Sequence, residues 1–309
     1  HLVVPRNRIN SATGIITRTE KSLLFVIPWG SHWIIGTTDT DWKLDLAHPA
    51  ASQSDIDYIL GHVNKLLADP LDRTDVVGVY AGLRPLLYGE SDSTSTLSRE
   101  HAVSSPVRGL TVIAGGKYTT YRVMAKDAVD SAVHGLERTV PKCVTENIPL
   151  VGADGYLGAF NARALTAERT GMRVSRVEHL LGRYGTLMGE LLDLIDADPE
   201  LGKPLESAPE YLKAEVVYAA SHEGAQHLED ILTRRTRISI EVPDRGEAAA
   251  DEVARLVAPI LGWDDQHVAE EIEHYRLRVL AERDSQEQPD DDTADAARLG
   301  APDVRAGVS

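Results

Sequence analysis

The sequence predicts a mixed α/β part followed by an all-α part, and three observations predict this fold class. Short β-branched and aromatic runs separated by polar turns fill the first forty residues. Beyond about residue 140, apolar residues recur only at helical spacing, and from residue 284 the chain is acidic with few apolar side chains. We therefore expect an α/β domain over 1–140, an all-helical domain over 141–283 and a disordered acidic tail over 284–309.

The first part contains four expected strands, which we interpret as an antiparallel sheet: HLVVP, GIITR, SLLFVIPWG and HWIIGTTD. Ser54 then precedes a segment with apolar residues at every third or fourth position, which predicts a helix. A further strand is expected in VVGVYAGLRPL, then a polar loop, GESDSTSTLSREH, a strand over 110–114 and a helix from about 119.

The second part contains only helical patterns. Apolar stripes at helical spacing, separated by Gly, Pro or Asp, predict helices near 156–170, 175–182, 185–194, 209–221, 225–233, 246–261 and 265–283.

The charge of the chain argues against a nucleic-acid partner. The formal net charge is −16, and all of the acidic excess lies after residue 142, because basic and acidic side chains are equal in number before it. Binding of nucleic acids depends largely on Lys and Arg at phosphates. A neutral first half remains compatible with a local site for a small anion.

Other features bear on the cellular compartment of the protein and on whether the sequence is a fragment. The single cysteine, Cys143, excludes an internal disulfide framework and suits a reducing compartment, and no Cys/His cluster has zinc spacing. No apolar run approaches the roughly 20 residues that span a bilayer. The chain begins with His1, inside an apparent strand. We expect a cytoplasmic protein without a metal site, whose natural amino-terminal part is missing here.

A glycine loop stands between the apolar run LTVIA and the amphipathic run VMAKDAVDSAV. It reads Gly115-Gly116-Lys117-Tyr118-Thr119-Thr120. A strand followed by glycines and a helix start presents backbone N–H groups and a positive helix end to an anion or carbonyl. Thr119 or Thr120 can cap the helix, and Lys117 adds a cation. The alternative is a plain glycine turn with a solvated lysine.

Two arginines lie at other breaks in the same part of the chain. Arg84 stands between Gly82 and Pro85 at an expected strand end, and Arg99 follows in the polar loop. A guanidinium suits bidentate binding of phosphate or carboxylate. With Lys117 these arginines could converge on a small anion, or each could be a separate surface charge.

Several motifs together resemble one family. HLVVPR, LLFVIPWG, IIGTTDTDW, YAGLRPL, GESDS, SREH and GGKYTTYRVMAKDA are similar, in order, to the FAD-dependent, quinone-linked glycerol-3-phosphate dehydrogenases. HEGAQHLEDILTRRTRIS resembles their carboxy-terminal helical domain, so the resemblance extends from His1 to about Arg283. It implies the substrate and flavin-ring part of an FAD/NAD(P)-binding fold of the D-amino-acid-oxidase type, followed by helices.

One family feature has no match. The family begins with a G-x-G-x-x-G fingerprint on its first strand, whereas Gly152, Gly155 and Gly158 have the wrong spacing and context. We therefore expect a fragment that lacks the site for the pyrophosphate and ADP half of FAD and is inactive alone.

The resemblance also implies roles for particular residues. Arg84 and Arg99 match arginines of the substrate pocket, and His1 matches a histidine near the flavin that could take the hydroxyl proton. A loop at the isoalloxazine ring is matched by Gly115, Gly116, Lys117, Thr119 and Thr120. Lys117 would stabilise negative charge on the reduced ring.

The implied reaction is oxidation of sn-glycerol 3-phosphate to dihydroxyacetone phosphate, with FAD as hydride acceptor and a quinone as electron acceptor. The implied location is the cytoplasm, with peripheral association at the inner face of the membrane as an open alternative. A basic run, Arg234, Arg235 and Arg237, fits a solvated helix end or contact with acidic lipid headgroups. Two other functions stay open: a glycerol-3-phosphate oxidase that uses oxygen, and a non-catalytic fragment that acts as a helical interaction module.

Overall fold

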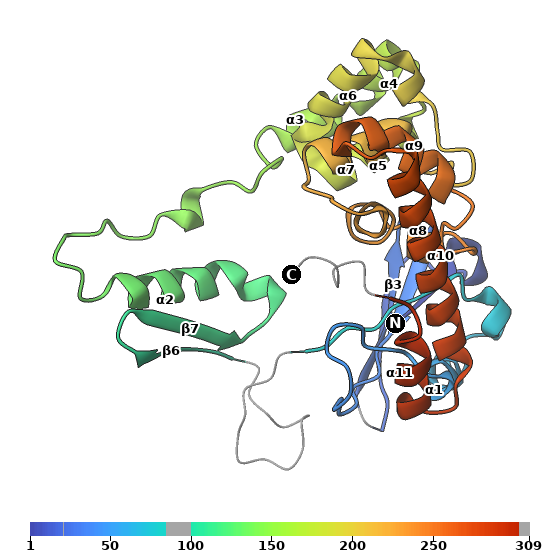
Figure 1. The fold of residues 1–309 in the computed structure, drawn as a ribbon, viewed down its shortest axis with the longest axis horizontal. Coiled ribbons are helices and arrows are strands. Elements are labelled where there is room, and N and C mark those ends of the chain that lie inside the picture. The colour runs from blue at the N-terminus through green and yellow to red at the C-terminus, as the bar shows by residue number, and fades with distance from the viewer. Residues whose placement is uncertain (21, 85–99, 303–309) are drawn as a thin grey trace. The chain divides into compact units, whose positions relative to one another are not determined.

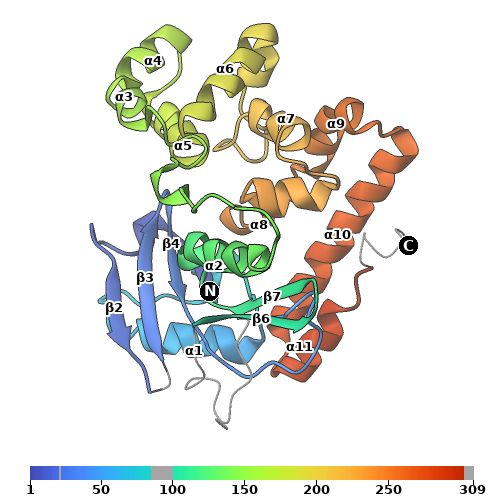
Figure 2. The ribbon, with the colours of Figure 1, turned by 90° about the vertical axis from the view of Figure 1, so that its left-hand side faces the viewer.

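The computed structural model describes residues 1–20, 22–84 and 100–302, and the chain forms two compact units (Figures 1 and 2). The first unit combines His1–Gly82 with Gly189–Ser309, and the second is Leu83–Met188. Each unit is described by its own packing.

An antiparallel five-stranded sheet forms the base of the first unit. Its strand order is β2-β3-β4-β1-β5. The strands are β1 (Leu2–Pro5), β2 (Ile15–Arg18), β3 (Leu23–Trp29), β4 (His32–Gly36) and β5 (Gly78–Val79). The four expected strands and their antiparallel pairing are confirmed, and the fifth is much shorter than VVGVYAGLRPL predicted.

Helix α1 (Gln53–Val63) packs against this sheet. Side chains alternate between the two faces of a strand, so each strand contributes every second residue to the core under the helix. That core contains Leu24, Val26, Trp33, Ile35, Ile56, Ile59, Leu60 and Val63. The N-cap is Ser52, two residues before the expected Ser54, and the Asp55 carboxylate accepts a hydrogen bond from the Ser52 amide at 3.3 Å.

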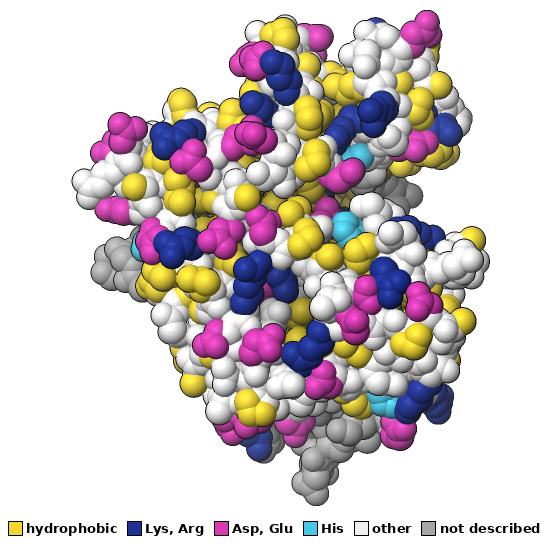
Figure 3. All heavy atoms as spheres, turned by 90° about the vertical axis from the view of Figure 1, so that its right-hand side faces the viewer, with side chains coloured by type: hydrophobic (Ala, Val, Ile, Leu, Met, Phe, Trp, Pro, Cys, Tyr) yellow, Lys and Arg dark blue, Asp and Glu magenta, His cyan; other side chains and the backbone are white. Residues whose placement is uncertain are grey.

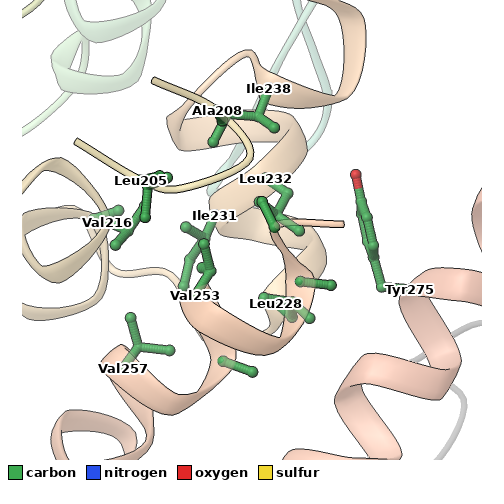
Figure 4. Packing of buried hydrophobic residues seen from close by; sticks show 14 of the residues in the cluster. Leu205, Ala208, Val216, Leu228, Ile231, Leu232, Ile238, Val253, Val257 and Tyr275 are labelled. Carbon is green, nitrogen blue, oxygen red and sulfur yellow. The ribbon is translucent and has the colours of Figure 1, made fainter. Parts of the chain in front are cut away.

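A second core lies among the carboxy-terminal helices of the first unit (Figure 4). It includes Leu205, Val216, Leu228, Ile231, Val253, Val257 and Tyr275. The helices are α6 (Met188–Ala197), α7 (Lys213–Ser221), a π-helix (Asp230–Arg235), α8 (Ile238–Glu241), α9 (Ala250–Leu261), α10 (Asp265–Glu287) and α11 (Asp291–Arg298).

Strand β5 meets this helical part at a very close backbone approach. A Cβ atom added at Gly78 would overlap the carbonyl oxygen of Ile240 in α8. Glycine is therefore the residue that lets the edge of the sheet and α8 pack together.

The second unit contains an antiparallel hairpin and helices. The hairpin is β6 (His101–Val107) and β7 (Leu110–Gly115), and His101 Nε2 lies 2.8 Å from Asp127 Oδ2 on the following helix. The helices are α2 (Tyr121–Val133), α3 (Tyr156–Asn161), α4 (Arg163–Thr170) and α5 (Val174–Tyr184). Strand β6 was not expected, because its serines and proline lack the strand signature and its only partner is β7.

Short 3-10 helices connect the larger elements of both units. They occupy Arg6–Arg8, Arg73–Asp75, Tyr118–Thr120, Thr145–Asn147, Gly185–Leu187 and Pro199–Gly202.

The structure corrects the expectation of a disordered tail over 284–309. Helix α10 continues to Glu287, and α11 lies against the first unit with Ala294 fully buried. The Ser52 hydroxyl donates to Asp291 at 3.0 Å, and the Asp45 amide donates to Asp295 at 3.3 Å. Asp290, Asp291 and Asp292 stand at the start of α11, where carboxylates interact favourably with the helix dipole. Residues 303–309 lie outside the described residues.

The compact units also divide the chain differently from the expected domains 1–140 and 141–283. Residues 189–283 share a unit with the amino-terminal sheet, whereas the hairpin and α2 share a unit with α3, α4 and α5. Sequence periodicity identifies elements but carries no information about which elements pack together.

Removal of residues 289–309 is expected to lower the free energy of unfolding by about 2 kcal/mol or more, because two side-chain hydrogen bonds and a buried alanine are lost. The melting temperature should fall by roughly 4–8 °C in differential scanning calorimetry. Ala294→Asp in the intact chain should act in the same direction. Unchanged melting temperatures in both variants would contradict the docking of α11.

Candidate active site

His1 lies in the first unit and is held from two sides. Its imidazole stacks on Tyr80, with ring centroids 4.9 Å apart and planes inclined by 1°. On the other side, a Cβ atom at Gly36 would come within 2.5 Å of the ring, so the glycine leaves the room that the imidazole occupies. Its backbone nitrogen donates to the Tyr80 carbonyl at 2.9 Å, which sets His1 beside the edge of the sheet.

Sequence reasoning missed Tyr80. Burial raises the pKa of its phenol, and the charge of Arg237 acts in the opposite direction. The available signal was weak, because an aromatic residue after a short strand is usually a packing residue. Its stacking on His1 makes it a positioning residue for that imidazole.

The glycine loop lies in the second unit, where β7 ends. Gly115 and Gly116 have φ values of 75° and 82°, which are left-handed conformations that favour glycine. Space at Gly116 is also limited, because an added Cβ atom would lie 2.5 Å from the Met124 sulfur on α2. The two glycines therefore turn the chain from β7 directly into the start of α2.

This turn exposes hydrogen-bond donors, as the sequence predicts. Lys117 is exposed, and the amides of Lys117, Tyr118 and Thr119 donate no backbone hydrogen bond within the described residues. The expected threonine cap is confirmed in position but not in its side-chain hydrogen bond. Thr120 occupies the N-cap position, but its hydroxyl donates to the Lys117 carbonyl at 3.0 Å and leaves the first amides without a side-chain acceptor. Thr119 is exposed beside it.

Of the two expected substrate arginines, the structure describes one. Arg84 is exposed at the end of a described stretch and has an interaction partner. Arg99 and Pro85 lie outside the described residues. His1 belongs to the first unit, whereas Arg84 and the glycine loop belong to the second, so the described contacts of His1 and of the loop lie within their own units.

A polar cavity of about 240 Å³ lies in the first unit beside the GTTDTD segment. Its lining includes the carboxylates of Asp39, Asp55 and Asp291 together with several hydroxyl groups. Burial raises the pKa of Asp291, and the Ser52 hydrogen bond opposes this shift. The concentration of carboxylates makes this cavity unsuitable for a phosphate group.

The segment containing Gly152, Gly155 and Gly158 does not form a dinucleotide-binding turn. It follows a 3-10 helix and leads into α3, with Gly155 as the left-handed N-cap residue. The Gly152 carbonyl accepts a hydrogen bond from the Thr186 amide at 2.9 Å. Gly152 packs closely against the Tyr184 carbonyl oxygen at the end of α5, whereas an added Cβ atom at Gly158 would meet nothing within 4 Å.

The basic run of the first unit is occupied by internal contacts. Arg234 pairs with Glu229 and with Asp230, and the Arg235 side chain donates to the Glu223 carbonyl at 2.7 Å. The Arg237 guanidinium lies 4.5 Å from the ring centre of Trp29. These contacts favour a structural role over binding of acidic lipid headgroups.

The surface charge is mixed rather than concentrated. Figure 3 shows basic and acidic side chains interspersed over one face of the molecule. This face therefore shows no continuous positive patch of the kind that nucleic-acid binding needs. None of the helices in the described ranges combines the length and hydrophobicity needed to cross a bilayer.

Comparison with known proteins adds sequence relatives. Residues 143–268 match the model of the C-terminal domain of alpha-glycerophosphate oxidase. The chain is 58% identical over 308 residues to glycerol-3-phosphate dehydrogenase 2 of Mycobacterium tuberculosis and 57% identical to glycerol-3-phosphate dehydrogenase of Mycobacterium leprae. Each alignment covers 100% of this chain and 53% of the relative, so the chain spans about half the length of these curated relatives.

A solved structure agrees with these relatives. The glycerol-3-phosphate dehydrogenase of Bacillus halodurans, crystallised in complex with FAD, superimposes with a TM-score of 0.75 at 26% sequence identity. The match covers 90% of this chain and 55% of that protein. Over most of its length the chain therefore shares the fold of a solved glycerol-3-phosphate dehydrogenase, and the chain belongs to the glycerol-3-phosphate dehydrogenase family.

Proposed function

We propose that this chain supplies the substrate part and the flavin-ring loop of an FAD-dependent enzyme that oxidises sn-glycerol 3-phosphate to dihydroxyacetone phosphate. The observation that carries the proposal is the glycine loop. It combines two left-handed glycines, three amides without a backbone acceptor and the exposed Lys117 at one helix start. The names of the relatives, glycerol-3-phosphate dehydrogenases, support glycerol 3-phosphate as the substrate.

The loop fits the polar edge of a flavin ring. FAD, when bound, supplies a hydride acceptor whose ring carries negative charge after reduction. Lys117, Gly115, Gly116, Thr119 and Thr120 would form the part of the site that meets this edge. Preorganised N–H groups and a cation stabilise charge where it develops without having to reorient.

Arg84 and His1 would act on the substrate. The Arg84 guanidinium would bind the phosphate through parallel hydrogen bonds, with Arg99 as a second proposed ligand. The His1 imidazole would accept the proton of the hydroxyl that is oxidised, since its usual pKa near 6.5 suits a general base. Tyr80 would keep the ring oriented through the observed stacking.

The final electron acceptor is proposed to be a quinone. The test measures the reduction of a water-soluble quinone by the protein that carries this chain, in the presence of glycerol 3-phosphate. It examines both the reaction and the electron acceptor. Stoichiometric hydrogen peroxide would instead identify an oxidase. Absence of both products with FAD present would favour the non-catalytic interaction module.

Lys117→Ala is expected to lower the flavin reduction potential by about 30–60 mV, which corresponds to loss of one charge-assisted hydrogen bond to the reduced ring. Spectroelectrochemical titration measures this potential. Lys126→Ala is the matched control, because Lys126 lies on α2 and pairs with Asp130 at 2.9 Å. Equal flavin reduction potentials in the two variants would show that Lys117 is a surface charge without contact to the flavin.

A further inference from the structure

A second cavity in the first unit is lined by charged side chains that the proposed reaction does not use. Its volume is about 190 Å³, and it lies between the 47–51 segment, the end of β5 and helices α8, α10 and α11. Its lining includes two guanidinium groups, of Arg278 and Arg298, and one carboxylate, of Glu282. All of these elements belong to one compact unit, so the cavity is defined by packing within that unit.

Arg298 is the unusual member of this lining. It is only 5% exposed, yet among the residues that the structure describes it has no hydrogen bond or ion pair. Burial, followed by the charge of Arg278, lowers the pKa of Arg298, while Glu282, Glu229 and Asp45 oppose the shift. A buried charge is costly unless a counter-ion and hydrogen bonds compensate it, and buried arginines are therefore almost always paired.

The other charges around the cavity already have partners. The Arg278 side chain lies 3.0 Å from Glu229 and donates to His48 Nδ1 at 3.2 Å. Glu282 lies 3.7 Å from the buried guanidinium of Arg245. These contacts hold Arg278 and Glu282 in place, so Arg298 is the cation of this lining that makes no direct hydrogen bond or ion pair within the described residues.

A hydroxyl donor adds to this cationic lining. Ser239, on α8, is 7% exposed, and its Oγ atom has no hydrogen-bond partner within the described part of the chain. A buried hydroxyl without a partner loses the hydrogen bonds that water would provide. Because Ser239 lines the same cavity as Arg298, one ligand could satisfy both groups.

We propose that this cavity is a binding site for a small tetrahedral oxyanion of the phosphate class, held by Arg298, Ser239 and Arg278. A tetrahedral anion has acceptor oxygens for donors that converge from three helices, whereas a carboxylate has only two oxygens. The source of the phosphate group is free phosphate or a small phosphomonoester. Tyr80, which stacks on His1, also lines this cavity, but Arg298, Ser239 and Arg278 have no role in the proposed reaction, so the site does not depend on the proposed function.

Isothermal titration calorimetry of the 309-residue chain with inorganic phosphate and with methyl phosphate tests this proposal. We expect saturable binding at one site per chain, and the tighter of the two probes identifies the source. Arg298→Gln should weaken binding about tenfold or more, and Ser239→Ala should weaken it about fivefold, as expected for a charge-assisted and an ordinary hydrogen bond.

Two controls locate the binding. Arg255→Gln removes an exposed arginine that pairs with Asp251 at 2.9 Å and should leave the affinity unchanged. Arg84→Ala should also leave it unchanged, which separates this cavity from the proposed substrate site. Binding that is lost in Arg84→Ala and retained in Arg298→Gln would overturn the proposal, as would the absence of saturable binding of either probe at millimolar concentration.

Thermal unfolding supplies a readout that does not depend on the affinity measurement. In phosphate-free buffer, Arg298→Met should unfold at the same temperature as the parent chain or higher, because an uncompensated buried charge is removed. Added phosphate should raise the melting temperature of the parent chain only. A lower melting temperature of Arg298→Met in both buffers would assign Arg298 a purely structural role and overturn the proposal.

Discussion

Arg84→Ala, in the protein that carries this chain, is expected to lower kcat/KM for glycerol 3-phosphate by about one to two orders of magnitude. A charge-assisted hydrogen bond contributes roughly 1.5–3 kcal/mol, and each 1.4 kcal/mol corresponds to a factor of about ten. Arg84→Lys should restore the activity only partly, because an ammonium group cannot form two parallel hydrogen bonds to phosphate. Steady-state kinetics of the three proteins measures both effects.

The division of the loss between KM and kcat reports what Arg84 contacts. If its guanidinium binds only the phosphate, equally in the ground and transition states, the loss should appear in KM. Contact with the reacting carbinol would lower kcat as well. Glycerol, which has no phosphate, should be oxidised equally poorly by the parent protein and the variant.

Arg108→Ala is the matched control for this experiment. Arg108 is an exposed arginine at the turn between β6 and β7, in the same compact unit as Arg84. Its removal should leave kcat/KM unchanged. Parent-like kinetics of Arg84→Ala would reject Arg84 as the phosphate ligand and leave Arg99 as the remaining candidate.

Gly78→Ala is expected to lower the free energy of unfolding by about 3 kcal/mol or more. The added methyl group would overlap the Ile240 carbonyl oxygen, and a backbone atom cannot move aside as a side chain can. This is the upper range of the cost of overpacking. The melting temperature should fall by roughly 6–12 °C, measured by circular dichroism or calorimetry.

Gly61→Ala tests whether this effect is specific to Gly78. Gly61 is an exposed residue within α1, and an added Cβ atom would meet nothing within 4 Å. Alanine favours a helix more than glycine by about 1 kcal/mol, so this variant should be as stable as the parent chain or more stable. Equal stability of the Gly78 and Gly61 variants would show that β5 and α8 do not pack as described.

The strands and long helices of this protein were predictable because their patterns are local. In β3, for example, the apolar run over 23–27 predicts a strand, although only the structure shows that Leu24 and Val26 are buried while Leu23 and Ile27 are exposed. The position of the glycine loop was predictable for a similar reason, since two glycines between an apolar strand and an amphipathic helix favour a turn into the helix start. The family resemblance rests on the same local motifs.

Tertiary contacts decided the features that the sequence did not reveal. The sequence of helix α11 has the composition of an acidic tail. In the structure Asp291 accepts a hydrogen bond from Ser52 and Asp295 accepts one from the Asp45 amide, both more than 200 positions away. Tyr80 became a positioning residue only through its contact with His1.

The sequence by itself determined most of the elements, the position of the glycine loop and the family, because propensity, hydrophobic period and motif spacing depend on near neighbours. The structure decided the division into units, the close approach of Gly78 to α8 and the cavity containing Arg298. Burial is the physical reason why the sequence predicts the first group of features but not the second. The same arginine is an ordinary surface charge in water and an uncompensated cation inside a packed unit, and only the fold selects between these environments.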